Sequence, residues 1–339
     1  MGRQAMAVAA AFDVLGVGNA IVDVLARADE RFLAESGLAK GSMRLIGPAE
    51  AVTLYDRLGP ATEVSGGSAG NTIAGVASLG GKAVFIGKVA DDQLGAIYRH
   101  DMTATGVTFT TPPLVGGPPT GRSMILVTPD GERTMNTLLG AAQDLTPADI
   151  DEELVAASTI TFLEGYLWDP PQAKDAFRKA AAVAHRAGRK VALTLSDAFC
   201  VDRYRGEFLD LIRTGAVDIV LANVAELKSL YETGSFEAGL EALRSEAALA
   251  AVTAGEDGSY VLSAAGVEHV PATAVETVVD ATGAGDLYAS GFLLGVSRGL
   301  PLATAASLGS FAAAEVISHM GARPATPLLA LAREAGYPL

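Results

Sequence analysis

Strand-like and helix-like segments alternate through the second half of the chain, and this pattern constrains the fold more than any other feature. Apolar runs at 158–165, 190–196, 216–223 and 248–255 read as strands, and segments with helical character separate them. Strands that alternate with helices form a parallel sheet with helices on both faces. We therefore predict an α/β fold with a parallel-rich central sheet.

The ends of several helices can be predicted from local signals. Asp169 is expected to cap a helix that opens with Pro170 and Pro171 and ends at Gly188. A second helix is expected near 204–214. The last third of the chain predicts three more helices, at 284–299, 302–319 and 326–335.

The first half is less regular. A buried strand is expected at 12–18, and a helix at 69–80 ends in a Gly-Gly pair before another strand at 83–89. For the rest of 21–138 we predict short strands and no further helix. Short strands are expected at 42–47, 107–111, 122–128 and 133–138, and the turn "PDGE" joins the last two. These strands predict a small sheet that is separate from the main one.

Composition narrows the classes of function. Half of the 339 residues are hydrophobic, and the formal net charge is −14. Nucleic acids and anionic membranes bind clustered Lys and Arg, so neither is an expected partner. No run of about 18 apolar residues predicts a membrane span. The N-terminal stretch is too short for a signal peptide and the single cysteine, Cys200, excludes an intramolecular disulfide, so we expect a cytoplasmic location.

The stretch "DATGAGD" follows a predicted strand at 278–280 and opens a predicted helix. Gly283, Ala284 and Gly285 leave the backbone accessible, so a phosphate could approach the unpaired amides of the first helical turn. The carboxylate of Asp286 would stand beside that anion, where it could accept a proton from a hydroxyl. Taken alone, the same residues would also suit an ordinary helix N-terminus.

A second glycine-rich stretch, "SGGSAGN", spans 65–71. Gly67 permits a ligand to approach the backbone, and Asn71 offers both a donor and an acceptor. The embedded "GGSAG" also fits G-x-S-x-G, the nucleophile elbow of hydrolases, which would make Ser68 a nucleophile. None of the four histidines stands out as its base, and this interpretation leaves "DATGAGD" unexplained.

In this order, the two stretches resemble the two signatures of the PfkB carbohydrate kinases, which have the ribokinase-like fold. The resemblance extends from "VLGVGNAIVD" to "ISHMGARP", over nearly the whole chain. The stretches "GNAIVD", "GLAKGSMRLI", "GGSAGNTIAG", "EGYLWD" and "GARP" look most like the adenosine kinases of this family. One position departs from the family pattern, because Ala281 stands where the second signature usually has Thr.

The resemblance implies one ribokinase-like domain over 1–339, with a small β lid formed mainly from 19–50 and 105–140. By position, Asp286 is implied as the catalytic base beside an anion hole. The "NVAE" segment matches a motif that is linked to Mg²⁺, although Asn and Glu at this spacing would equally form a helix cap. The other implied positions are the anion hole (Gly283, Ala284 and Gly285), substrate binding (Asn19, Asp23, Gly67 and Asn71), ATP binding (Arg133, Asn223, Thr253 and Gly255) and a water-mediated magnesium contact (Glu226).

The resemblance further implies transfer of the ATP γ-phosphate, with Mg²⁺, to the 5′-hydroxyl of a ribonucleoside, and adenosine is the first expectation. Three alternatives stay open: a PfkB-type kinase of ribose or a keto-sugar, a serine hydrolase that uses Ser68, and a nucleoside-binding protein without turnover. Activation by K⁺ and the choice between a monomer and a homodimer are also open.

Overall fold

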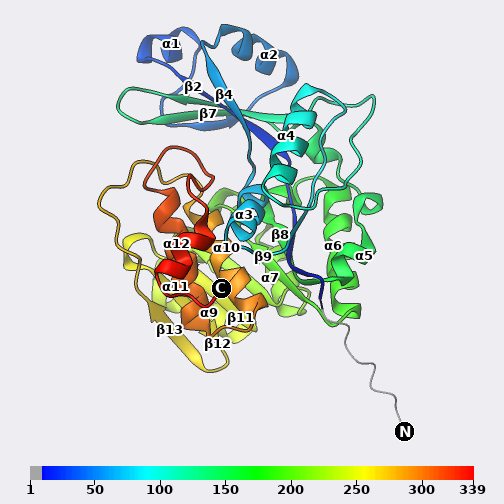
Figure 1. Cartoon of the computed structure of the whole chain (residues 1–339), viewed down its shortest axis with the longest axis vertical. Helices are drawn as coiled ribbons and strands as arrows, with labels where there is room; N and C mark the ends of the chain where they lie inside the picture. The colour runs from blue at the N-terminus through cyan, green and yellow to red at the C-terminus, as the bar shows by residue number, and fades with distance from the viewer. Residues whose placement is uncertain (1–9) are drawn as a thin grey trace.

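Two β-sheets of unequal size organise the chain (Figure 1). The computed structural model describes residues 10–339, so most of the N-terminal stretch that we predicted not to be a signal peptide lies outside the described residues. The larger sheet has the strand order β13-β12-β11-β10-β9-β8-β1-β5. Its strands are β1 (Phe12–Val17), β5 (Ala83–Ile86), β8 (Ser158–Glu164), β9 (Lys190–Thr194), β10 (Ile219–Asn223), β11 (Leu249–Thr253), β12 (Ser259–Ser263) and β13 (Gly266–Val270).

The large sheet is parallel from β5 to β11, and β12 and β13 are added antiparallel at one edge. The prediction of an α/β fold with a parallel-rich sheet is therefore confirmed. Successive residues of a strand point to opposite faces. In β8, Phe162 belongs to one hydrophobic core and Leu163 to a second core on the other face, and Ile219 and Val220 of β10 divide in the same way.

Helices cover both faces of this sheet. The first core also contains side chains of α3 (Ser68–Ser78), α10 (Ala284–Ser297), α11 (Leu302–Val316) and α12 (Leu328–Glu334). The second core contains side chains of α5 (Glu152–Ala156), α6 (Pro171–Arg186), α7 (Ala198–Arg213), α8 (Val224–Leu230) and α9 (Phe236–Glu246). No helix within residues 10–339 is long and apolar enough to cross a membrane.

The smaller sheet lies at the top of Figure 1 and has the order β3-β7-β6-β2-β4. Its strands fall within 21–65 and 121–138, whereas we predicted a lid from 19–50 and 105–140. Its strands are β2 (Ile21–Arg27), β3 (Met43–Leu45), β4 (Ala61–Ser65), β6 (Gly121–Val127) and β7 (Arg133–Leu138). The helices α1 (Glu30–Glu35) and α2 (Pro48–Arg57) accompany it, and α4 (Gln93–Ala104) packs beside β4.

The prediction of a single helix between 21 and 138 is wrong. The expected helix at 69–80 is α3, but α1, α2 and α4 are also present. Asp29 caps α1 by accepting a hydrogen bond from the Phe32 amide at 2.7 Å, and Asp92 caps α4 by accepting one from the Gly95 amide at 2.8 Å. These side-chain caps begin helices whose apolar periodicity is weak.

Two predicted strands are also wrong. In the segment 107–111, only Thr108 forms a bridge, which pairs it with Val84 of β5. The segment 278–280 forms no strand, and the amides of Val279 and Asp280 bond instead to the carbonyl of Ile317, the residue that follows α11. The approach to "DATGAGD" is therefore a loop that is tied to the C-terminal part of the chain.

The predicted cap of α6 is wrong as well. This helix begins at Pro171, with Pro170 in the cap position and no side-chain cap. The Asp169 carboxylate instead accepts a hydrogen bond from the Tyr204 hydroxyl. The helix expected near 204–214 begins earlier, at Ala198, because Asp197 caps α7.

Candidate active site

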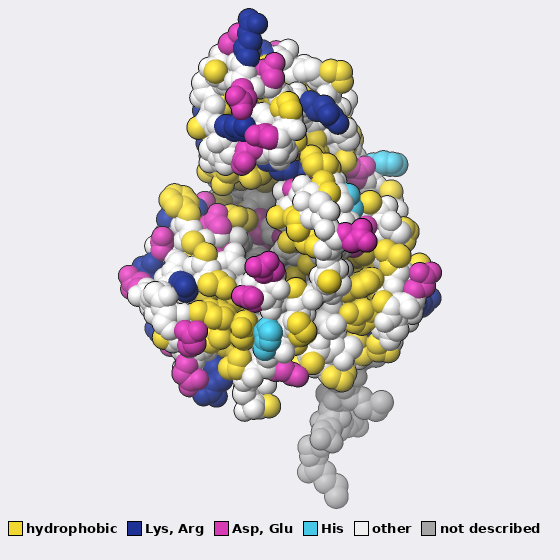
Figure 2. Space-filling view, turned by 90° about the vertical axis from the view of Figure 1, so that its left-hand side faces the viewer, with side chains coloured by type: hydrophobic (Ala, Val, Ile, Leu, Met, Phe, Trp, Pro, Cys, Tyr) yellow, Lys and Arg dark blue, Asp and Glu magenta, His cyan; other side chains and the backbone are white. Residues whose placement is uncertain are grey.

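A cavity of about 860 Å³ lies between the two sheets. Figure 2 shows it as a hollow beneath the part of the molecule that carries the small sheet. In open α/β folds, ligands bind outside the carboxyl ends of the strands. The lower wall is built in this way, from Glu164 at the end of β8, Asn223 at the end of β10 and the first turn of α10. The small sheet supplies the opposite wall.

The "DATGAGD" stretch forms the start of α10 as predicted. Gly283 is the N-cap in a left-handed conformation (φ +80°), and a side chain at this position would come within 2.9 Å of Ala322. No side chain caps α10, so its N-terminal amides face the cavity with the positive end of the helix dipole. The Ala284 amide is the exception, because it donates to the Ala281 carbonyl at 3.2 Å.

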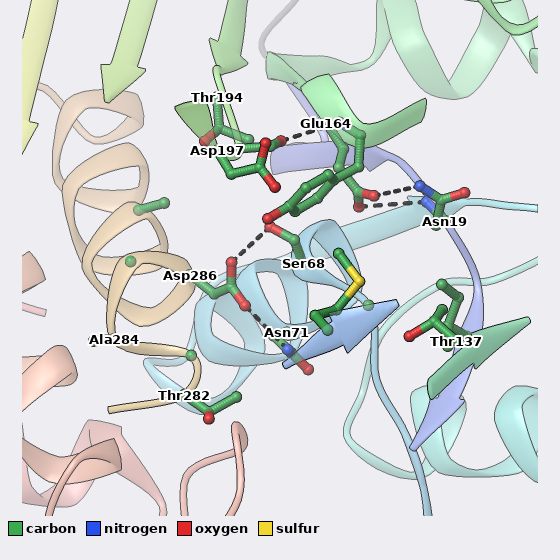
Figure 3. Close-up of a pocket in the computed structure, with 18 of the residues that line it drawn as sticks. Asn19, Ser68, Asn71, Thr137, Glu164, Thr194, Asp197, Thr282, Ala284 and Asp286 are labelled. Atoms are coloured by element: carbon green, nitrogen blue, oxygen red, sulfur yellow. Dashed lines mark hydrogen bonds between the residues drawn. The ribbon is translucent and has the colours of Figure 1, made fainter. Parts of the chain in front are cut away.

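Asp286 lies in the first turn of α10, and α3 holds its carboxylate from the other side (Figure 3). The Ser68 hydroxyl donates to Oδ1 at 2.6 Å, and the Asn71 side-chain amide donates to Oδ2 at 3.0 Å. Burial raises the pKa of Asp286 to about 6, while these two hydrogen bonds and the charge of Arg323 act in the opposite direction. At neutral pH the carboxylate is therefore mostly ionised and rigidly oriented.

Glu164 positions the start of α3 and the loop before β2. Its carboxylate accepts from the Ala69 amide at 2.8 Å. It also accepts from the Asn19 side-chain amide at 2.6 Å (Figure 3). Gly67, in a left-handed conformation (φ +80°), lets the turn pass close to Asn19, where a Cβ would lie 2.2 Å from the Asn19 carbonyl oxygen. Burial raises the pKa of Glu164 to about 7, although the donors around it oppose this shift.

Asp23 lines the same cavity from β2. Within residues 10–339, its side chain has no hydrogen-bond or ion-pair partner. Burial raises its pKa to about 7, and the charge of Asp286 adds to the shift, while Arg323 and Arg133 oppose it. A half-buried carboxylate without a partner destabilises the fold in the absence of a ligand and is available to accept hydrogen bonds from one.

In the absence of ligand, Asp23→Asn should be more stable than the wild type at pH 7 and above, and this advantage should disappear towards pH 4. The unfolded chain ionises Asp23 near pH 4, whereas the folded protein keeps the proton until about pH 7. The folded state thus binds more protons across this range, so this carboxyl lowers the stability as the pH rises. Thermal melting of both proteins from pH 4 to 8 tests this, and a pH-independent difference would contradict it.

Some of the residues predicted to bind ATP or the metal line the cavity, and others do not. Asn223 and Glu226 line the cavity and form a complete capping box at the start of α8. Both Glu226 carboxylate oxygens accept from Asn223, at 2.6 and 3.0 Å, and burial raises the Glu226 pKa to about 7. Thr253 also lines the cavity, whereas Gly255 does not.

Arg133 does not line the cavity in this structure. Its guanidinium pairs with the buried carboxylate of Asp280, the first residue of "DATGAGD". The same carboxylate accepts from the amides of Thr282 at 3.1 Å and Gly321 at 2.8 Å. Asp280 therefore joins the small sheet, the start of α10 and the "GARP" loop.

The pfkB family carbohydrate kinase model matches residues 39–328. The chain belongs to this family. As a pfkB kinase, it is a phosphotransferase that acts on a hydroxyl group, and kinases of this family use ATP with a divalent metal.

Solved structures of two kinases are similar to this pfkB kinase over nearly its whole length. An adenosine kinase from Sinorhizobium meliloti is 57% identical with a TM-score of 0.90, and the match covers 96% of this chain and 99% of that one. A probable sugar kinase protein from Rhizobium etli CFN 42 is 52% identical with a TM-score of 0.91, covering 97% and 99%. The 5-dehydro-2-deoxygluconokinase of Shouchella clausii is 27% identical over 328 residues, covering 94% of this chain and 93% of the relative.

Two residues of the pfkB kinase site received no role from the sequence. Glu164 ends a strand that was predicted correctly, where a carboxylate would be expected to face a ligand, so this signal was present in "EGYLWD". Arg323 donates to Asn71 from the "GARP" loop, and nothing in the local sequence indicates this contact. Both lie in stretches that carry the family resemblance.

The hydrolase interpretation of Ser68 does not fit this arrangement. Its hydroxyl donates to a carboxylate that is itself held by Asn71, and no histidine among the described residues contacts it. His185 pairs with Asp218 on the surface. Ser68 is therefore a residue that positions Asp286.

Proposed function

We propose that this pfkB kinase transfers the γ-phosphate of ATP to the 5′-hydroxyl of a ribonucleoside, and that adenosine, which gives AMP, is its substrate. One observation carries the choice of a nucleoside: the cavity has a polar end and an apolar end. The polar end contains the carboxylates of Asp23, Glu164 and Asp286. The wall formed by the small sheet carries five apolar side chains next to the polar Arg44, Ser123 and Thr137; the apolar ones are Ile21, Met43, Leu45, Ile125 and Met135.

The apolar wall suits a planar base better than a bare sugar. Met43 and Leu45 are 49% and 56% exposed, although both face a cavity, so a ligand that covers them gains from the hydrophobic effect. The hydroxyls of a bare sugar would find no partners among these apolar side chains, and unpaired polar groups weaken binding. A ribose at the carboxylates would direct an attached base toward this wall.

The similar proteins support two candidate classes of substrate. The S. meliloti protein, an adenosine kinase at 57% identity, favours a nucleoside. The R. etli protein and the S. clausii enzyme favour a sugar or a sugar acid as the second candidate.

In the proposed mechanism, the oxygen of the 5′-hydroxyl attacks the γ-phosphorus of ATP while Asp286 accepts the hydroxyl proton. The bond between the γ-phosphorus and the bridging oxygen breaks, and ADP leaves. With a pKa of about 6, Asp286 is ionised at neutral pH, and Ser68 and Asn71 direct it. The amides at Gly283 and Gly285 and the dipole of α10 stabilise the negative charge on the transferring group. The Ala284 amide contributes only if it leaves Ala281.

The divalent metal would neutralise charge on the ATP phosphates. Mg²⁺ takes oxygen ligands and keeps several waters. Glu226 suits a water-mediated contact, because both of its carboxylate oxygens already accept from Asn223. Arg133 would add positive charge after exchanging Asp280 for the phosphates.

An ATP-dependent phosphorylation assay tests the proposed function. The panel contains adenosine, other ribonucleosides, ribose, keto-sugars and 5-dehydro-2-deoxygluconate. We expect the highest kcat/KM with adenosine. A higher value with a sugar or a sugar acid would replace the nucleoside by that substrate, and no transfer from ATP to any acceptor would reject the proposal.

Substrate together with an ATP analogue should protect 122–138 from hydrogen exchange, because the small sheet would close on the ligands and exclude water. Strands β6 and β7 of this segment contribute residues to the cavity wall. Exchange measured by mass spectrometry, with β12 and β13 at the far edge of the large sheet as an internal control, tests the closure. Unchanged exchange at 122–138 would contradict a moving lid.

A further inference from the structure

Arg323 stands behind the proposed catalytic carboxylate, outside the cavity wall. It lies in the "GARP" loop after α11 and is partly buried. Its Nε donates to Oδ1 of Asn71 at 2.7 Å, and its Nη2 lies 3.4 Å from the sulfur of Met102. Within residues 10–339 it forms no ion pair with a carboxylate at 4 Å or less. The main polar contact of the partly buried Arg323 is therefore the side-chain oxygen of Asn71.

This contact determines which way the Asn71 amide faces. An arginine side chain has only donors, so the oxygen of Asn71 must point toward Arg323. The NH₂ group of Asn71 must then point the other way, where it donates to Oδ2 of Asp286 at 3.0 Å. If the amide were turned over, donors would face Arg323 and two oxygens would face each other at Asp286.

We propose that Arg323 is a positioning residue, which fixes the Asn71 amide so that its NH₂ group orients the Asp286 carboxylate for proton acceptance. The proposal deepens the function proposed above and rests on Asp286 as the base. Ser68 holds the other oxygen of Asp286, so the carboxylate is fixed at both ends. The chain Arg323–Asn71–Asp286 joins three segments that are distant in the sequence.

The charge of Arg323 also favours the ionised form of Asp286. Arg323 supplies the positive charge that acts on this carboxylate. The other ionisable groups that face Asp286 are acidic. These are Asp23 from β2, Glu164 from β8 and Tyr166, which follows β8. Losing the guanidinium should therefore make Asp286 harder to ionise as well as less well oriented.

The test compares Arg323→Gln and Arg323→Lys with the wild type. In Arg323→Gln, kcat should fall by about tenfold, and the acidic limb of its pH profile should move up by on the order of one pH unit. Arg323→Lys keeps the charge, so the limb should return toward that of the wild type. Its flexible ammonium lacks the planar donor, however, so kcat should stay severalfold low. This variant carries the test if Arg323→Gln does not fold.

Arg99→Gln is the matched control. Arg99 is also partly buried and donates to two carbonyls, those of Phe109 at 2.9 Å and Thr111 at 2.6 Å, away from Asp286. Its loss should lower the melting temperature without moving the limb. An equal shift in Arg99→Gln, or an unmoved limb in a folded Arg323→Gln, would overturn the proposal. So would a wild-type kcat in Arg323→Lys.

A second readout is independent of the kinase reaction. The pKa of Asp286 can be followed by NMR with ¹³C-labelled aspartate, and its signal is assigned as the one missing from Asp286→Asn. This pKa should rise in Arg323→Gln even if none of the tested acceptors is phosphorylated. An unchanged pKa would overturn the role of Arg323, whereas a failed phosphorylation panel would reject only the proposed function.

Discussion

Replacing Asp286 by asparagine should lower kcat by about 10²–10⁴-fold, the usual contribution of a general base. Asparagine has nearly the same shape, and it can still accept from Asn71 while the Ser68 hydroxyl turns to accept from its NH₂ group. It cannot take the proton from the substrate hydroxyl. Since the transition state of phosphoryl transfer is largely dissociative, the loss could fall at the lower end of this range. Single-turnover phosphoryl transfer is the measurement.

The same variant should lose the acidic limb near pH 6, because the group that titrates there is gone. Its affinity for ATP should change little or increase slightly, since a negative charge beside the γ-phosphate is removed. Asp29→Asn is a control for replacing an aspartate by asparagine: Asp29 caps α1 with one carboxylate oxygen, away from the cavity, and asparagine can also cap a helix. A folded Asp286→Asn with wild-type turnover would remove Asp286 from the mechanism.

Asp280→Asn is unsuitable as a second control. From the sequence we expected Asp280 to end a strand and to affect stability more than chemistry. The structure instead pairs it with Arg133 and with the amides of Thr282 and Gly321. An amide at this position would disturb both the start of α10 and an arginine that is proposed to reach the phosphates.

The strands of the second half could be predicted because their signal is local. The predicted strand at 158–165 is β8, Ser158–Glu164, and it is buried on nearly its whole length. A run that is apolar on both faces is recognisable without knowledge of its neighbours. β7, Arg133–Leu138, was predicted with its observed bounds because the turn "PDGE" ends directly before it.

The same local signal fails where a buried segment pairs with a strand at one residue only. Val107, Phe109 and Thr111 are all nearly fully buried, so the alternation that predicted a strand at 107–111 is real. Only one bridge forms, between Thr108 and Val84 of β5, and no other residue of the segment pairs with that strand. The converse holds for α1, where Leu33 is the buried residue and the apolar stripe is too short to indicate a helix.

For the candidate site, the residues could be predicted from motifs, but the contacts between them could not. The residues named from motifs, such as Asp23, Asn71 and Asp286, line one cavity, although their roles stay predictions. The contacts that hold them could not be predicted, because each joins distant parts of the chain. Ser68 and Asp286 are 218 positions apart, and Asn71 and Arg323 are 252 apart. The packing of α3 against α10 brings Ser68 and Asn71 to Asp286.

Removal of the Asp23 carboxylate should raise KM for the nucleoside by about 10²-fold and leave kcat much less affected. The carboxylate has no partner among the described residues, so a ribose diol would supply the donors that it lacks. Hydrogen bonds to a charged group contribute about 1.5–3 kcal/mol each, and about 1.4 kcal/mol corresponds to tenfold in affinity. Binding should also release a proton near pH 6–7, because donors to the carboxylate favour its ionised form.

The substrate provides the matched test of this role. Wild type and Asp23→Ala are compared with adenosine and with 2′,3′-dideoxyadenosine, which keeps the 5′-hydroxyl and lacks the diol. The wild type should use the dideoxy compound poorly, whereas Asp23→Ala should treat the two compounds nearly alike, because the group that distinguishes them is gone. Asp23→Ala should also melt higher than the wild type at pH 8 without ligand, since a half-buried charge without a partner has been removed. An increase in KM that is caused by misfolding would be accompanied by a lower melting temperature instead. Equal use of both compounds by the wild type would show that Asp23 does not bind the diol.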